Sequence, residues 1–161
     1  MKRAAVLVVV AFAIALAGCG GGGSSANSAP LETGRFRLDE WSITADRSTL
    51  HAGGQTITAT NIGNMTHELV IVAASDVGAI STKADGSVDE PSLDAVKVGE
   101  IADVAAGTSR THVFNLAPGS YVVFCNLVEQ MGHGGSMGGM GEGMTHVHFD
   151  LGMHTTFNVT A

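Results

Sequence analysis

The stretch GEIADVAAGTSRTHVFNLAPGSYVVFCNL, residues 99–127, contains runs with strand character on either side of turn residues. Residues 111–116, THVFNL, alternate in the manner of a strand, with the two large apolar side chains on one face. The Ala-Pro-Gly-Ser segment at 117–120 predicts a turn, and a nearly continuous apolar strand follows it. The stretch therefore predicts a hairpin whose last strand ends at Cys125.

Four more short runs rich in Thr, Val, Ile and Phe flank this stretch, with glycine, asparagine and proline between them. Each has the composition of a strand, and in the first run Trp41 indicates a bulge or a switch of face. Residues 75–100 are acidic, lack a strong period and predict a long connection with room for a short helix. Strands of this number and spacing predict an all-β fold, a Greek-key antiparallel sandwich or barrel. The four runs are RFRLDEWSIT (35–44), GQTITATNIG (54–63), HELVIVAA (67–74) and TTFNVTA (155–161).

The N-terminal segment has the features of an export signal followed by a linker. Two basic residues precede an apolar run that is too short to span a bilayer comfortably, because about 20 residues are needed. The run ends in LAGC, residues 16–19, which resembles the lipobox of bacterial lipoproteins. By that resemblance, residues 1–18 are a signal peptide and the new N-terminal Cys19 carries lipid. The glycine- and serine-rich residues 19–33 then predict a flexible tether to a domain at residues 34–161.

Charge and cysteine content narrow the function classes. Without the two basic residues of the signal, six basic side chains remain against fifteen acidic ones, a net charge of −9. Such a chain lacks the basic surface needed to bind nucleic acid, and we exclude that class of function. If Cys19 is lipidated, Cys125 is the single remaining thiol. Exported chains usually pair their cysteines, so an unpaired one is either buried and inert or bound to a metal.

Three motifs on these strands resemble the cupredoxin family, the plastocyanin- and azurin-like type 1 (blue) copper proteins. THEL at 66–69 is similar to the segment with the first histidine ligand, YVVFCN at 121–126 to that with the cysteine, and HFDLGM at 148–153 to the final histidine and methionine. The resemblance covers about residues 36–161, apart from the acidic connection and most of the segment after the cysteine. It implies one type 1 copper held by His67, Cys125, His148 and Met153.

This donor set suits copper independently of the family. Two imidazoles, a thiolate and a weak thioether contact accept both Cu(I) and Cu(II). The metal keeps the cysteine deprotonated, since the thiolate is the binding form. Ligands on the strand ends of a rigid sandwich rearrange little when the copper charge changes, which favours fast one-electron transfer. The sequence offers no convincing general base, and a copper enzyme usually needs further copper sites and a second domain. We therefore expect a protein that is not an enzyme.

The spacing of the ligands departs from the family. Relatives place only a few residues between the cysteine and the second histidine, whereas 22 residues separate Cys125 from His148 here. His146 and His133 are therefore competing candidates for the second histidine. His148 is preferred because Met153, five residues later, directly precedes the last strand. Three methionines compete with Met153, and three histidines elsewhere are interpreted as non-ligands. The methionines are Met137, Met140 and Met144, and the histidines are His51, His112 and His154.

The inserted segment carries its own soft ligands on glycine-rich chain. Thioethers favour Cu(I), so the segment could form a second, labile copper site or a copper-loading arm. The alternative is a surface loop whose methionines cover the apolar rim of the site. A second departure is Glu68, since many relatives have an asparagine directly after the first ligand, where its side chain ties the two ligand loops together. The candidate Cu(I) ligands are Met131, His133, Met137, Met140 and Met144.

Together these features predict an electron carrier, lipid-anchored at the outer face of a bacterial cytoplasmic membrane and facing the periplasm or the cell exterior. It would be a monomer that exchanges single electrons with redox proteins in or at that membrane. The alternative is a copper chaperone or resistance protein that stores or transfers copper through the Met/His-rich loop at residues 131–146. One tightly held copper with an intense blue band would favour the carrier, and several labile Cu(I) ions the chaperone.

Overall fold

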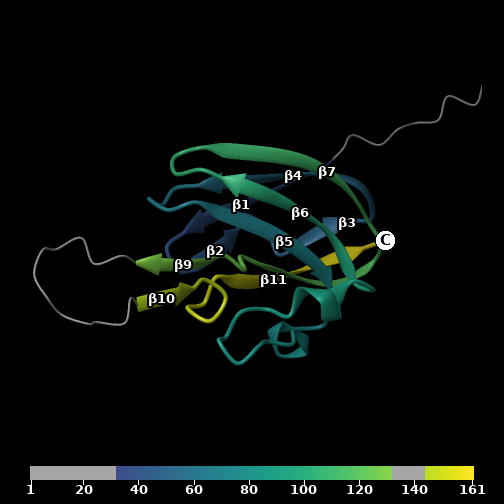
Figure 1. Ribbon diagram of the computed structural model, residues 1–161. Coiled ribbons are helices and arrows are strands. Elements are labelled where there is room, and N and C mark those ends of the chain that lie inside the picture. The colour runs from purple at the N-terminus through teal and green to yellow at the C-terminus, as the bar shows by residue number, and fades with distance from the viewer. Residues whose placement is uncertain (1–31, 132–143) are drawn as a thin grey trace, which may run out of the picture.

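Eleven strands and two short 3-10 helices make up the described part of the chain, residues 32–131 and 144–161 of the computed structural model (Figure 1). The 3-10 helices, η1 (Val77–Ala79) and η2 (Glu90–Leu93), lie in the acidic connection. The strands are β1 (Glu32–Asp39), β2 (Ser42–Ala45), β3 (Thr49–His51), β4 (Gly53–Asn61), β5 (His67–Ala73), β6 (Lys97–Val104), β7 (Ser109–Leu116), β8 (Gly119–Phe124), β9 (Val128–Met131), β10 (Met144–Val147) and β11 (His154–Thr160).

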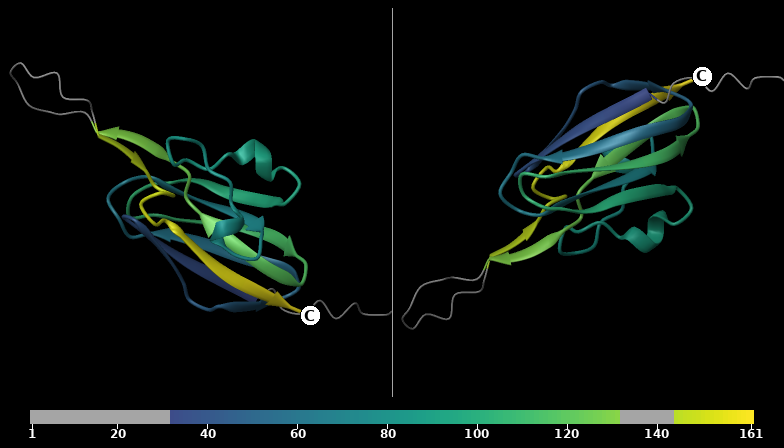
Figure 2. Two further views of the ribbon diagram at one scale, coloured as in Figure 1. Left: turned by 90° about the horizontal axis from the view of Figure 1, so that it is seen from below. Right: turned by 90° about the horizontal axis from the view of Figure 1, so that it is seen from above.

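The strands form two packed sheets and a separate ribbon. One sheet has four strands in the order β2-β1-β4-β7, and the other has five in the order β3-β11-β8-β5-β6. β9 and β10 pair only with each other and project from the end of the sandwich opposite to the C-terminus (Figure 1, Figure 2). The all-β prediction is confirmed.

Strand β5 of the five-stranded sheet is buried on both faces, which explains the continuous apolar run of HELVIVAA. Leu69 and Ile71 of β5 face the main core between the sheets, whereas Val70 and Val72 lie in a second apolar cluster on the outer face. Side chains from the acidic connection close this second cluster, so the connection acts as a third layer over the sheet. Those side chains are Ile80, Val88 and Leu93.

The prediction of antiparallel sheets is wrong in part, because each sheet also contains one parallel pair of strands. β1 pairs in parallel with β4, and β3 pairs in parallel with β11. Parallel neighbours need an intervening crossover, which β2 and β3 supply between β1 and β4. The predicted hairpin within residues 99–127 is also wrong. β6 pairs with β5, β7 pairs with β4, and β8 lies between β5 and β11, so consecutive strands alternate between the two sheets.

Two further segments differ from the sequence interpretation. RFRLDEWSIT is not one strand with a bulge, because β1 and β2 form a hairpin around a two-residue turn at Glu40 and Trp41. The segment after Cys125, which lacks an evident pattern in sequence, contains β9 and β10. These two strands satisfy each other's backbone groups, with Met144 opposite Met131 and Val147 opposite Val128.

The predicted signal peptide (1–18), the lipid site Cys19 and nearly all of the tether (19–33) lie outside the described residues and stay predictions. β1 begins at Glu32, close to the predicted start of the domain at residue 34. No helix in the described ranges is long and apolar enough to cross a membrane.

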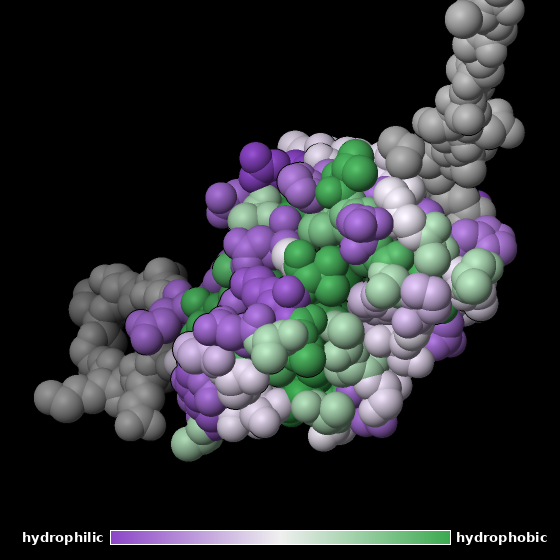
Figure 3. All heavy atoms as spheres, turned by 90° about the vertical axis from the view of Figure 1, so that its right-hand side faces the viewer, coloured by the Kyte–Doolittle hydropathy of each residue, from purple (hydrophilic) through white to green (hydrophobic). Residues whose placement is uncertain are grey.

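On the face shown in Figure 3, apolar side chains form a band across the middle with polar side chains on both sides.

Candidate metal centre

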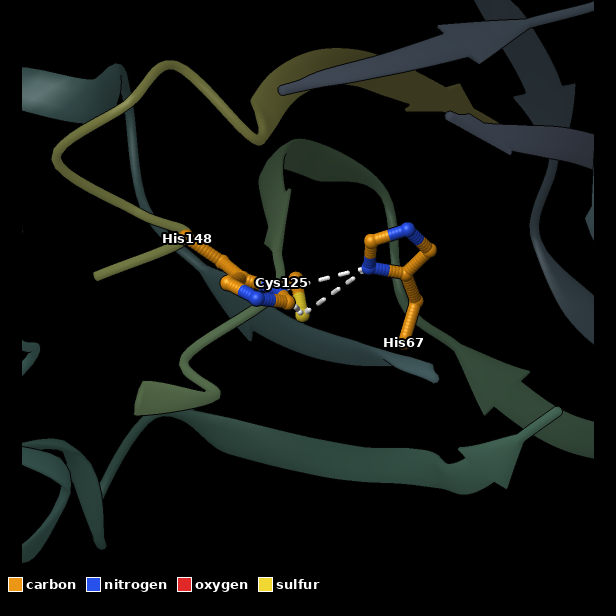
Figure 4. A group of neighbouring side chains, drawn as sticks. All are labelled: His67, Cys125 and His148. Carbon is orange, nitrogen blue, oxygen red and sulfur yellow. Dashed lines mark hydrogen bonds between the residues drawn. The ribbon is translucent and has the colours of Figure 1, made fainter. Parts of the chain in front are cut away.

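Three side chains from separate elements converge at the end of the sandwich from which the ribbon projects. His67 opens β5, Cys125 follows the last residue of β8, and His148 follows β10. Their side chains point toward one another and are fully buried (Figure 4). The two Nδ1 atoms lie 3.2 Å apart, and Cys125 Sγ lies 3.2 Å from Nδ1 of His148 and 4.0 Å from Nδ1 of His67. This is the one such cluster of metal-binding side chains within residues 32–131 and 144–161.

A metal ion fits between these three donor atoms. A triangle with sides of 3.2, 3.2 and 4.0 Å has a circumscribed radius of about 2.0 Å, so one point lies that far from all three atoms. Metal–imidazole bonds are about 2.0–2.1 Å long and metal–thiolate bonds about 2.3 Å, taking zinc as the reference. The Nε2 atoms of both histidines are buried without a hydrogen-bond partner, and it is the Nδ1 atoms that face the shared gap.

The protonation states of the histidines suit ligands. Burial lowers the pKa of His148 to about 4, and the neighbouring His67 and His146 add to this effect. Burial also lowers the pKa of His67, against the opposing charge of Glu40. Both imidazoles are therefore neutral near pH 7, which is the form that binds metals.

The thiol of Cys125, unlike the imidazoles, must lose a proton before it can bind a metal. Burial raises its pKa to about 12, although a backbone N–H of Glu68 donates to the sulfur at 3.4 Å. The thiol keeps its proton near pH 7 unless a cation replaces that proton. A buried thiol between two neutral imidazoles thus favours a metal that binds thiolate strongly.

Met153 is placed beside the cluster by backbone hydrogen bonds. Its N–H donates to the carbonyl of His148 at 3.0 Å, and its carbonyl accepts from the N–H of Cys125 at 3.0 Å. The Met153 side chain is fully buried in the same core cluster as Cys125. The structure therefore brings the four residues of the predicted ligand set together, with three donor atoms in one triangle.

The turn that leads into His67 is held by two polar side chains. The Asn61 amide donates to the carbonyls of Met65 at 2.6 Å and Val104 at 2.8 Å. The Glu40 carboxylate accepts from the N–H groups of Asn64 at 2.7 Å and Met65 at 2.8 Å. The same Glu40 oxygen lies 3.6 Å from Nε2 of His67. These contacts fix the start of β5 and thereby the direction of the imidazole.

Glu68 ties the two ligand segments together. Its Oε1 accepts the backbone N–H of Asn126 at 3.0 Å, so the residue after His67 holds the residue after Cys125. The Asn126 side chain continues outward, accepting the N–H of Val88 at 2.6 Å and donating to Glu90 at 2.9 Å. The acidic connection is therefore bonded to the cysteine segment.

Among the described residues, the structure leaves the other histidines named in the sequence analysis outside the cluster. His146 on β10 contacts Trp41, with ring centroids 5.1 Å apart, and does not join the three donors. His51 and His112 are exposed, and His154 packs against Phe149. His133, Met137 and Met140 lie outside the described residues, as do the side chains of Met131 and Met144.

Sequence reasoning missed two residues that contact the cluster, Glu40 and Trp41. The ring centroids of Trp41 and His148 lie 5.2 Å apart, with an angle of 73° between the ring planes. Both residues come from the short turn between β1 and β2. The clue in the sequence is the break in strand alternation at Trp41, which marks a turn toward the site and not a bulge.

Comparisons with known proteins support this architecture. No protein-family model matches the chain, and a search among curated proteins finds no match. Solved structures do match. Dithionite-reduced auracyanin from the photosynthetic bacterium Roseiflexus castenholzii aligns with a TM-score of 0.50 at 19% identity, covering 80% of this chain and 97% of its own. Auracyanin B aligns with a TM-score of 0.52 at 23% identity, covering 84% of this chain and 93% of its own.

Auracyanins are cupredoxins, and the likeness shows that this chain has the cupredoxin fold. The resemblance drawn from the three sequence motifs is thereby confirmed at the level of the fold. The buried His–Cys–His cluster at the end of the sandwich is the feature of that fold from which a function can be argued.

Proposed function

We propose that the protein binds one copper ion through His67, Cys125 and His148, with Met153 as a weak fourth ligand, and carries single electrons. The observation that supports this is the triangle of two Nδ1 atoms and one Sγ atom, sized for a metal ion. Copper bound there would supply a one-electron couple between Cu(I) and Cu(II).

The residues of the chain provide a rigid and dry setting for that couple. The cluster is fully buried, and its backbone is cross-linked by the bonds from Met153 to His148 and from Cys125 to Met153. The N–H of Glu68 points at the sulfur and stabilises negative charge there. Such a site exchanges electrons without large movement, and the fully buried donors leave no place for a substrate at the metal.

The test is a copper titration of the soluble domain, residues 32–161. We expect one tightly held copper per chain and an intense blue absorption band from thiolate-to-copper charge transfer. A chain that binds several labile Cu(I) ions without a blue band would instead be a copper chaperone or resistance protein. A chain that binds no copper would refute the proposal.

We also propose that the carrier is exported, anchored by lipid on Cys19, and exchanges electrons with redox proteins at the membrane as a monomer. LAGC at residues 16–19 and the glycine-rich tract after it support this location. Cys19→Ser should release the full-length protein from membranes or stall its processing. A Cys19→Ser protein that is processed and stays membrane-bound would disprove the anchor.

A further inference from the structure

All four proposed ligands are hidden from solvent. His67, Cys125, His148 and Met153 each have 0% of their surface exposed. A redox partner therefore cannot touch either imidazole. Electron tunnelling weakens steeply with distance, so the side chain that separates an imidazole from the surface decides where electrons enter and leave.

Trp41 is in that position. Its indole contacts the His148 ring edge-on, at a centroid distance of 5.2 Å, and it contacts His146 of the ribbon at 5.1 Å. Trp41 is only partly buried, so the same side chain that touches His148 also reaches the surface. Among the described residues, it is the aromatic side chain that links this proposed ligand to solvent.

The backbone at Trp41 is kept in a costly conformation. Its φ is 68°, in the left-handed region that a bulky side chain rarely adopts. Across from it, a Cβ added to Gly152 would lie 3.2 Å from the Trp41 carbonyl oxygen, so the turn packs tightly against the loop between His148 and Met153. Glu40, the other turn residue, lies 3.6 Å from Nε2 of His67. Strained backbone gathers at functional sites, and this strained turn contacts both imidazoles, which indicates that the turn has a functional role.

We propose that Trp41 is the point of electron entry and exit, covering His148 and taking the place of an exposed imidazole edge. This inference rests on the proposed copper function. One electron passes between an external one-electron partner and the copper by way of the indole, which is not itself oxidised. No proton moves, and no bond forms or breaks.

The first test measures the rate at which a bulky inorganic complex, tris(phenanthroline)cobalt(III), oxidises the reduced copper protein. Trp41→Leu keeps the site covered with a saturated side chain, and the rate should fall at least fivefold. Trp41→Phe should stay within about twofold of the wild type. The control is Val113→Thr, at a 53% exposed position on β7, which should leave the rate unchanged. A smaller fall in Trp41→Leu, or a faster rate, overturns the proposal.

The second test needs no copper, so it separates failure of this inference from failure of the proposed function. In the apoprotein, diethyl pyrocarbonate should modify the exposed His112 and spare His148, as read by mass spectrometry. Trp41→Ala should make His148 reactive while His67 stays protected. If His148 reacts in the wild type as readily as His112, or stays protected in Trp41→Ala, Trp41 is not its cover and the proposal fails. A wild type that passes this test and binds no copper would refute the copper function and with it the electron path, and would leave only the role of Trp41 as the cover of His148.

Discussion

Glu68 Oε1 accepts the backbone N–H of Asn126 at 3.0 Å, and this single bond joins the segment of the first histidine to the segment of the cysteine. By the resemblance to the cupredoxin family, an asparagine would be expected to make such a tie at this position. Here a carboxylate makes it, and burial raises the pKa of Glu68, with Glu90 and Glu100 adding repulsion. Burial thus disfavours the ionised form of Glu68, whereas the hydrogen bond from Asn126 requires its acceptor oxygen.

Removing the acceptor oxygen of Glu68 should therefore lower the free energy of unfolding more than removing its charge does. Glu68→Ala leaves the Asn126 N–H without a partner and should lower the free energy of unfolding of the apoprotein by about 1–3 kcal/mol. Glu68→Gln keeps a carbonyl acceptor and should stay within about 1 kcal/mol of the wild type near pH 7. Urea unfolding measures both. Equal losses in the two variants would show that the charge, and not the hydrogen bond, matters.

The ligand assignment predicts graded spectral effects. Cys125→Ser should abolish the blue band, because the band requires the thiolate. His148→Ala should leave an open position that added imidazole fills, with recovery of absorbance. Met153→Leu should keep copper bound and shift the reduction potential, since the axial contact is weak. Visible spectra and redox titration measure these changes.

His146→Ala is the matched control for His148→Ala. His146 contacts Trp41 at the same centroid distance, within 0.1 Å, yet stays out of the donor cluster. The copper stoichiometry of His146→Ala should therefore equal that of the wild type. Loss of the blue band in His146→Ala, with an unchanged spectrum in His148→Ala, would exchange the two assignments.

The buried histidine also predicts a pH dependence of the apoprotein. The pKa of His148 lies at about 4 in the folded state, below its ordinary value of 6.5. Between these values the unfolded chain binds a proton that the folded chain does not, so stability falls as the pH is lowered from about 6.5 to about 4. Urea midpoints across this range should show the fall, and His148→Gln should reduce it. An equally steep fall in His148→Gln would assign the effect to other groups.

Copper binding should release a proton. Near pH 7 the Cys125 thiol is protonated, because burial raises its pKa to about 12, whereas burial lowers the pKa of both imidazoles. We expect about one proton per copper, measured with a pH indicator in weak buffer. Release of no proton would mean that Cys125 is already a thiolate or is not a ligand.

How much could be predicted from sequence differs between the strands and their pairing. The run of HELVIVAA predicts β5 because local composition sets strand formation. The parallel neighbours β1 and β4 could not be foreseen, since their contacts join residues far apart in the chain. The same limit explains the wrong hairpin, because the choice of sheet for β7 depends on β4 and not on its own turn.

The site shows the same division. His67, Cys125 and His148 could be singled out because their chemistry is rare and each stands at the end of a strand or beside it. Trp41 and Glu40 could not, because a tryptophan at φ 68° contradicts the preference for glycine in such a turn. Only the packed structure shows that this turn lies over the two imidazoles.

The last prediction concerns the long segment between Cys125 and His148. Met131 at the end of β9 lies directly opposite Met144 at the start of β10, so the ribbon can be closed between them. Replacing residues 132–143 by Asn-Gly would supply a two-residue turn of the kind that joins paired antiparallel strands. Shortening a loop changes the free energy of loop closure little, about 0.6 kcal/mol for each halving, so the sandwich should fold as before.

If Cys125, His148 and Met153 are the ligands, the shortened protein should be blue and hold one tightly bound copper. It should also lose any additional Cu(I) bound by His133, Met137 and Met140. Copper per chain and the visible spectrum measure both effects, with the full-length loop as the control. Loss of the tightly held copper on shortening would show that residues 132–143 contain a ligand, and the choice of His148 over His133 would then be wrong.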